Sequence, residues 1–266
     1  MENINCKICK LTSLSFDSVV VDGINLALSE YLSLTTKSNP IEVCLGDADT
    51  ELYEDSGKSV CLGIKPYISG TSTNKTTGDV SYYTIINISE CDSELILRRA
   101  CGGLADLIVW QRGLAEIICE DDQESVDLKS YLELLSNGYH EYLAIKIMES
   151  VNDIIKDNYV NRCIQLYRIW SQVNNTHSIY DALKNLIGLV SVFIGDGATI
   201  NTDLESKPTI LTLEMAQLQI ALKEVFERLN KGEMLDMSSD YWFNYEFRMR
   251  SIESVIASGR DIDVLS

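Results

Sequence analysis

Histidine and proline are scarce in this chain of 266 residues, which holds two histidines and three prolines. A hydrolytic zinc site needs about three nitrogen, oxygen or sulfur ligands, an open position and a base. His140 and His177 alone cannot supply the usual histidine-rich ligand set. Because few prolines interrupt the chain, we expect long helices to dominate the fold.

Basic residues are also few. The chain has 22 lysines and arginines against 40 aspartates and glutamates, which gives a formal charge of −18. This balance argues against direct binding to the phosphates of nucleic acids. Two interpretations stay open: the acidity keeps the protein in solution, or it forms a surface that imitates phosphates and occupies a basic protein.

Long apolar runs and an export signal are missing as well. No uninterrupted apolar stretch approaches the ~18 residues that span a bilayer, and the first five residues lack the basic and apolar parts of a signal peptide. The eight cysteines do not form a compact disulfide framework in a chain of this length. Cys6 and Cys9 form a CxxC without a second pair, so we expect loose thiols near a mobile terminus. We predict a reduced, cytoplasmic protein with no cofactor and no membrane contact.

The periodicity of apolar residues predicts an α+β fold that is mostly α-helical. Residues 16–34 have the period of a helix, and short β-rich runs at 41–45, 59–64 and 81–88 predict a small three-stranded sheet. The polar segment 69–80 predicts a loop. Further helices are predicted at 94–110, 130–135, 139–157, 159–173, 178–194, 211–231 and 238–258, with Asn137-Gly138 as a break.

These elements suggest a division of the chain into a core and a helical bundle. In this division the sheet packs on the central helix at 94–110, and a C-terminal helical bundle follows. The predicted parts are an N-terminal segment at 1–15, an α+β core at 16–157, a helical region packed on that core at 158–258, and a tail at 259–266.

The central helix carries Gly102-Gly103 in its middle, next to Arg98 and Arg99. Glycine in a helix interior is less favourable than alanine by ~1 kcal/mol. Two adjacent glycines therefore predict that another backbone passes close to this helix, or that something once occupied this space.

Two further segments are candidates for contacts with a partner. The stretch after the central helix is either a solvated loop or an acidic contact surface. Its carboxylates are Glu116, Glu120, Asp121, Asp122, Glu124 and Asp127. The aromatic run Tyr241–Tyr245 either closes a core or anchors a partner.

The order of helix, small sheet, central helix and a helix opening with Glu141-Tyr-Leu-Ala144 resembles the small gluzincin metallopeptidases over about residues 16–157. In that family the central helix carries HExxH, whose histidines bind zinc, and a later Glu-x-x-Ala helix supplies the third ligand. Matching the helices places HExxH at Arg99–Gly103, where both histidines and the glutamate are missing. Glu141 fits the position of the third ligand, with Ala144 as the small residue that follows it.

The resemblance implies a pseudo-enzyme without bound metal. Its vestigial site would comprise Arg98, Arg99, Cys101, Gly102, Gly103 and Glu141. Glu141 would then pair with one of the two arginines, or it lies on the helix surface instead. A site rebuilt from Cys101, His140 and Glu141 is disfavoured, because adjacent helix residues point ~100° apart and cannot easily chelate one ion.

Resemblance and charge together predict a non-catalytic protein-binding module on an inactive metallopeptidase-like scaffold. Its partner would be a basic nucleic-acid-processing or host-defence protein, inhibited by a nucleic-acid mimic of the kind that phages and mobile elements use. The alternative is a hydrolase with a displaced, non-standard metal site.

Overall fold

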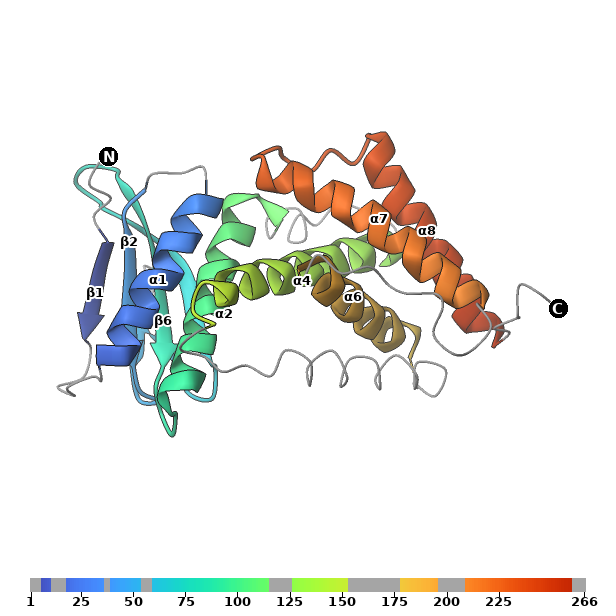
Figure 1. Cartoon of the computed structure of the whole chain (residues 1–266). Coiled ribbons are helices and arrows are strands. Elements are labelled where there is room, and N and C mark those ends of the chain that lie inside the picture. Colours follow the sequence, from blue (N-terminus) through green and yellow to red (C-terminus); the bar gives the residue numbers. More distant parts are fainter. Residues whose placement is uncertain are drawn as a thin grey trace. The chain divides into compact units, whose positions relative to one another are not determined.

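The computed structural model describes residues 6–10, 18–35, 39–53, 59–114, 126–152, 178–195 and 209–259. The chain divides into two compact units (Figure 1). The α+β unit contains Met1–Gln111 and Lys146–Asp157, and the helical unit contains Arg112–Ile145 and Asn158–Ser266. Residues 112–145, which were expected in the α+β core, therefore group with the helical unit.

Two helices pack against each other in the α+β unit. Helix α1 (Ser18–Leu34) buries Ile24, Leu28 and Tyr31, which recur with the helical period on one face. Helix α2 (Ser93–Gln111) begins where the carboxylate of Asp92 accepts a hydrogen bond of 2.8 Å from the amide of Leu95. The predicted helices at 16–34 and 94–110 are thus confirmed to within two residues.

The sheet of this unit has the strand order β1-β2-β6-β5. Its strands are β1 (Cys6–Lys10), β2 (Ile41–Gly46), β6 (Val80–Asn87) and β5 (Tyr67–Thr73). Strands β1, β2 and β6 are parallel and lie side by side in Figure 1, and β5 is an antiparallel edge strand. Helix α2 packs on β6 and β5.

The face of the sheet that points away from α2 has a core of its own. Thr84 of β6 points toward α2, and its neighbour Ile85 points to the opposite face, where it packs with Cys44 and Leu62. A separate antiparallel pair, β3 (Glu51–Tyr53) and β4 (Ser59–Cys61), contributes Leu52 to this cluster.

A small sheet was expected, but its membership differs from the prediction. Residues 59–61 belong to the separate pair β3–β4, and the predicted loop at 69–80 contains most of β5. The polar side chain of Ser69 is accommodated in β5 because its hydroxyl has hydrogen-bond partners. This hydroxyl lies 3.0 Å from the carbonyl oxygen of Gly103 and 3.1 Å from the hydroxyl of Thr84. The segment Cys6–Lys10, expected to be a loose terminus, is a strand whose backbone pairs with β2.

The helical unit is built from four described helices. These are α4 (Val126–Glu149), α6 (Ile179–Gly195), α7 (Ile210–Asn230) and α8 (Asp240–Ser258). The side chains of Thr209 and Ser239 cap the N-termini of α7 and α8, and Gly259 ends α8 in the left-handed conformation with φ 61°. The predicted helices at 178–194, 211–231 and 238–258 are confirmed, and that at 159–173 lies outside the described residues.

One predicted break is wrong: α4 continues through Asn137-Gly138. A Cβ on Gly138 would lie 2.6 Å from Cγ2 of Ile187 and 2.9 Å from the hydroxyl of Ser191, both on α6. Gly138 therefore marks a close helix–helix contact and not a helix end. No helix in the described ranges is both long and apolar enough to cross a membrane.

An aromatic cluster joins α4 to α7. The ring of Phe226 lies 5.2 Å from that of Tyr139 and 5.1 Å from that of Tyr142. Asn230 accepts a hydrogen bond of 2.8 Å from the hydroxyl of Tyr139 and donates one of 2.9 Å to that of Tyr142. Because the buried hydroxyls have partners, the cluster fixes the packing of these two helices.

Candidate functional site

The glycine pair of α2 lies in direct contact with the sheet. A Cβ on Gly102 would stand 2.8 Å from Cε1 of Tyr67 on the edge strand β5. A Cβ on Gly103 would collide with the hydroxyl of Thr84 on β6. The close neighbours of these glycines are therefore side chains of the sheet, whereas another backbone had been expected. Descent of the contact from a metal site stays a prediction.

The two arginines of α2 have partners within the α+β unit. Arg98 forms an ion pair of 2.6 Å with Glu94 one turn earlier, and Arg99 donates a hydrogen bond to the carbonyl oxygen of Asn87. Glu141 is partly buried on α4 and belongs to the helical unit. Its pairing with an arginine of α2 accordingly stays a prediction.

Cys101 is fully buried on α2. Removal from water disfavours the charged thiolate and raises the pKa of this thiol to about 12. A neutral thiol is a poor nucleophile and a poor metal ligand. Within the described ranges, no group of three or more histidine, cysteine, aspartate or glutamate side chains is placed so that it could hold a metal ion. Cys101 is best described as a small apolar core residue.

The acidic stretch after α2 is not a site that the structure describes. Glu116, Glu120, Asp121, Asp122 and Glu124 lie outside the described residues, and Asp127 is described only through the backbone of the first turn of α4. Its role as a contact surface stays a prediction.

The aromatic run Tyr241–Tyr245 divides between the core and the surface. Tyr241, Trp242 and Tyr245 are buried, whereas Phe243 is 67% exposed. Phe247, one turn further along, is 52% exposed, and the two ring centroids lie 6.5 Å apart. Three rings of the run therefore fill the core, as the first alternative expected. Phe243 faces solvent together with Phe247, as a residue that anchors a partner would.

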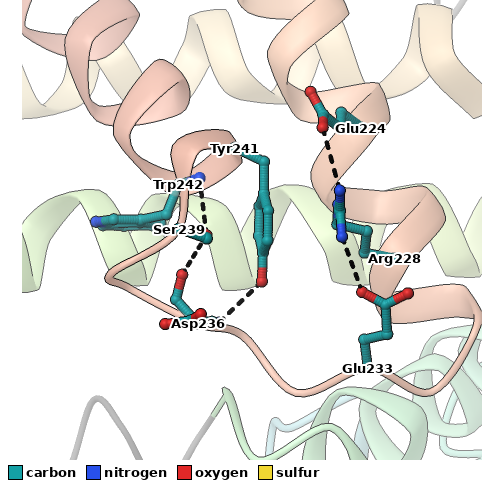
Figure 2. Close-up of polar contacts among 7 residues, drawn as sticks. All are labelled: Glu224, Arg228, Glu233, Asp236, Ser239, Tyr241 and Trp242. Atoms are coloured by element: carbon teal, nitrogen blue, oxygen red, sulfur yellow. Dashed lines mark hydrogen bonds and ion pairs between the residues drawn. The ribbon is translucent and has the colours of Figure 1, made fainter.

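The connection between α7 and α8 forms a depression of about 430 Å³. Figure 2 shows the polar contacts around it. Half of its lining residues are acidic, and all come from one continuous segment of the helical unit. The lining residues are Glu224, Arg228, Glu233, Met234, Asp236, Ser239, Asp240 and Tyr241. Four carboxylates and one guanidinium leave three negative charges at this position.

Arg228 organises the depression. Its guanidinium lies 3.6 Å from the carboxylate of Glu224 and 3.1 Å from that of Glu233, between the two as Figure 2 shows. The guanidinium also lies 4.5 Å from the centre of the ring of Tyr241. One cation thus ties together the end of α7, the connection and the start of α8.

Asp236 and Tyr241 hold the connection in place. The amide of Asp236 donates a hydrogen bond of 2.9 Å to the hydroxyl of Tyr241, and the hydroxyl of Ser239 donates to the carbonyl oxygen of Asp236 (Figure 2). The side chain of Asp236 accepts bonds from the amide and hydroxyl of Ser238, which lower the pKa of this carboxyl. Asp236 therefore stays charged under ordinary conditions.

The exposed phenylalanine pair follows Asp240 of the depression along α8. Asp240, Phe243 and Phe247 are spaced three and four residues apart on α8, so they lie on one face of the helix. Met234, in the connection, is 58% exposed. We call the set Glu224, Glu233, Met234, Asp236, Asp240, Phe243 and Phe247 the α7–α8 surface.

Part of this surface could be predicted from the sequence. Successive helix residues turn by about 100°, which places Phe243 roughly opposite Tyr241 and about 100° from Trp242. The Glu224–Arg228 pair also has the helical spacing of four. The joining of Glu233 and Tyr241 to Arg228 depends on the path of the connection, which no local pattern predicts.

Comparison with known proteins adds no relative. Neither family models, curated proteins nor solved structures give a match to this chain.

Proposed function

We propose that this chain is a non-catalytic protein-binding module whose α7–α8 surface takes a basic protein. One observation carries the proposal: a depression with four carboxylates and the exposed side chains of Met234, Phe243 and Phe247 come from the one α7–α8 segment. Aromatic side chains and methionine are enriched in protein interfaces, and a few aromatic anchors supply most of the binding energy. Carboxylates beside such anchors select a partner that carries lysine or arginine.

The charge of the whole chain supports the same class of partner. A net charge of −18 attracts basic proteins over long range and raises their rate of association. It also repels nucleic acids, which compete for the same basic surfaces. We therefore infer that the chain inhibits a basic nucleic-acid-processing or host-defence protein by imitating phosphates.

The scaffold in this proposal is an inactive metallopeptidase-like core. The tight contact of Gly102 with Tyr67 supports it, because an emptied metal site has to be refilled or collapse to reach normal packing density. The buried, neutral thiol of Cys101 at the centre of α2 agrees with a core role.

Paired variants in a capture experiment test the binding function. The tagged wild-type chain, presented to an extract of cells that encode it, should retain a basic protein, and the purified partner is then titrated. Phe243→Ser with Phe247→Ser should weaken binding by about 30-fold or more, as expected for hot-spot residues. Leu26→Ser, on the exposed face of α1, is the matched control and should leave the affinity unchanged. Equal affinities for all three proteins would overturn the assignment of the surface.

Elemental analysis separates this proposal from the hydrolase alternative. We expect substoichiometric zinc in the purified chain after dialysis. One zinc ion per chain, retained through dialysis, would instead support a displaced metal site.

A further inference from the structure

The edge strand β5 has a row of backbone groups that point away from the sheet. In an antiparallel pair, residues that exchange hydrogen bonds with the neighbouring strand alternate with residues that do not. The amide of Asn87 bonds to the carbonyl oxygen of Pro66, and the amide of Asn74 bonds to that of Asp79. With the register of β5 on β6, this pattern turns Ile68, Gly70 and Ser72 toward β6. Ser69, Thr71 and Thr73 consequently turn their amides and carbonyls outward.

These outward groups have no backbone partner in the described part of the chain. The side chain of Ser69 bonds toward α2 and β6, but its main-chain groups face the open edge. Thr71, Ser72 and Thr73 are exposed. Unpaired edge groups of this kind are a template for another strand.

Three features by which proteins block edge pairing, namely proline, charge and a bulge, are missing from residues 67–73 themselves. Residues 67–73 contain no proline and no charged side chain, and their pairing with β6 runs through seven consecutive residues without a bulge. Lys65 and Lys75 stand beyond the two ends of the strand. A positively charged partner strand would therefore find no carboxylate on β5 to pair with. An uncharged partner strand matches the uncharged side chains of β5.

We propose that β5 pairs with β5 of a second copy of this chain, which joins two four-stranded sheets into one. The outward residues are symmetric about Thr71. An antiparallel copy with Thr71 on the two-fold axis pairs Thr71 with Thr71, and Ser69 with Thr73, on both sides. Cross-strand threonine and serine pairs are favourable neighbours in sheets.

The dimer should be weak and should respond to salt in a characteristic way. A seven-residue edge buries far less than the ~1,000 Å² of a stable interface, so we expect a Kd of about 100 µM. Two chains of charge −18 repel each other, and salt screens this repulsion. Dimerisation should thus strengthen with salt, whereas binding of a basic partner to the α7–α8 surface should weaken.

Sedimentation of the full chain tests the proposal without any partner protein. We expect monomer at about 5 µM and a reversible dimer at about 300 µM, more abundant at 500 mM than at 50 mM salt. Thr71→Lys keeps the amide but places two like charges on the axis, and it should raise Kd by about tenfold or more. Thr71→Pro removes the outward amide and should do the same. Thr71→Val and Phe243→Ser are controls that should dimerise like the wild type.

Amide hydrogen exchange supplies a second readout that does not depend on the variants. Protection of Ser69, Thr71 and Thr73 should rise by about threefold between the low and high concentrations, while that of Ile68 and Gly70 stays constant. A monomer at every concentration, a dimer unaffected by Thr71→Lys, or a dimer that weakens with salt would each overturn the proposal. Loss of dimerisation in Phe243→Ser would assign self-association to the α7–α8 surface instead.

Discussion

The ring of Tyr67 lies against the α-carbon of Gly102, so that a Cβ on this glycine would stand 2.8 Å from Cε1. This contact fixes the edge strand β5 to the helix α2. At this point the backbone of the helix touches a side chain of the sheet directly, with no helix side chain between them. The packing of the α+β unit is consequently sensitive to added volume at this position.

Alanine at Gly102 or Gly103 should destabilise the protein. The added methyl group meets the ring of Tyr67 or the buried hydroxyl of Thr84, and overpacking of this kind typically costs about 1–3 kcal/mol. Gly188 on α6 is a matched control, because a Cβ there meets nothing within 4 Å. Gly188→Ala should therefore stabilise by up to ~1 kcal/mol. Denaturant melts give all three values, and stabilisation by Gly102→Ala and Gly103→Ala would refute the close contact.

Gly138 offers the same comparison within one helix. Gly138→Ala should destabilise by about 1–3 kcal/mol, since its methyl group would overlap Ile187 and Ser191 of α6. The neighbouring Asn137 is exposed, and Asn137→Ala should stabilise α4 by several tenths of a kcal/mol (~0.5). Equal effects of the two substitutions in urea melts would mean that α6 does not pack at Gly138.

Stability should fall at alkaline pH because of Cys101. Burial raises the pKa of this thiol from 9.0 to about 12, so above pH 9.0 the unfolded chain releases a proton that the folded chain keeps. The stability that the buried thiol confers is complete below pH 9.0 and is lost as the pH rises toward 12. Because of this group, the free energy of unfolding measured in urea should be about 2 kcal/mol lower at pH 10.5 than at pH 8.

Cys101→Ala provides the control for the alkaline effect. The variant lacks the thiol, so the difference between the two melts should shrink by about that amount. Burial also raises the pKa of Tyr139 to about 12. This hydroxyl therefore adds its own loss of stability at alkaline pH, and that loss should remain in Cys101→Ala. An unchanged pH dependence in Cys101→Ala would show that the thiol is not buried.

The helices could be predicted from the sequence because their apolar residues repeat with a strong period. The sheet could not be predicted to the same degree. Strand β5 is made of tyrosine, isoleucine, serine, glycine and threonine, and its polar side chains resemble those of a loop until their partners on α2 and β6 are known. Gly138 likewise resembles a helix stop, because local sequence does not show that α6 lies against it.

The candidate surface was predictable only in part. The sequence marked Tyr241–Tyr245 and left two roles open, and helical geometry assigns the core role to Trp242 and the surface role to Phe243. The contribution of Glu233 and Asp236 depends on how the connection between α7 and α8 folds around Arg228. Such a contact joins residues through tertiary structure, which no periodic pattern encodes.

The most direct measurement of the proposed function is photo-crosslinking from the α7–α8 surface. A benzoylphenylalanine at position 243 should form an adduct with one basic protein in cells that encode the chain, because Phe243 is 67% exposed and lies one helical turn after Asp240. The same probe at position 26, on the exposed face of α1, should form none. The account predicts an adduct at 243 that salt suppresses and that Asp236→Asn with Asp240→Asn reduces. The absence of an adduct at 243, equal adducts at 243 and 26, or an acidic partner would contradict it.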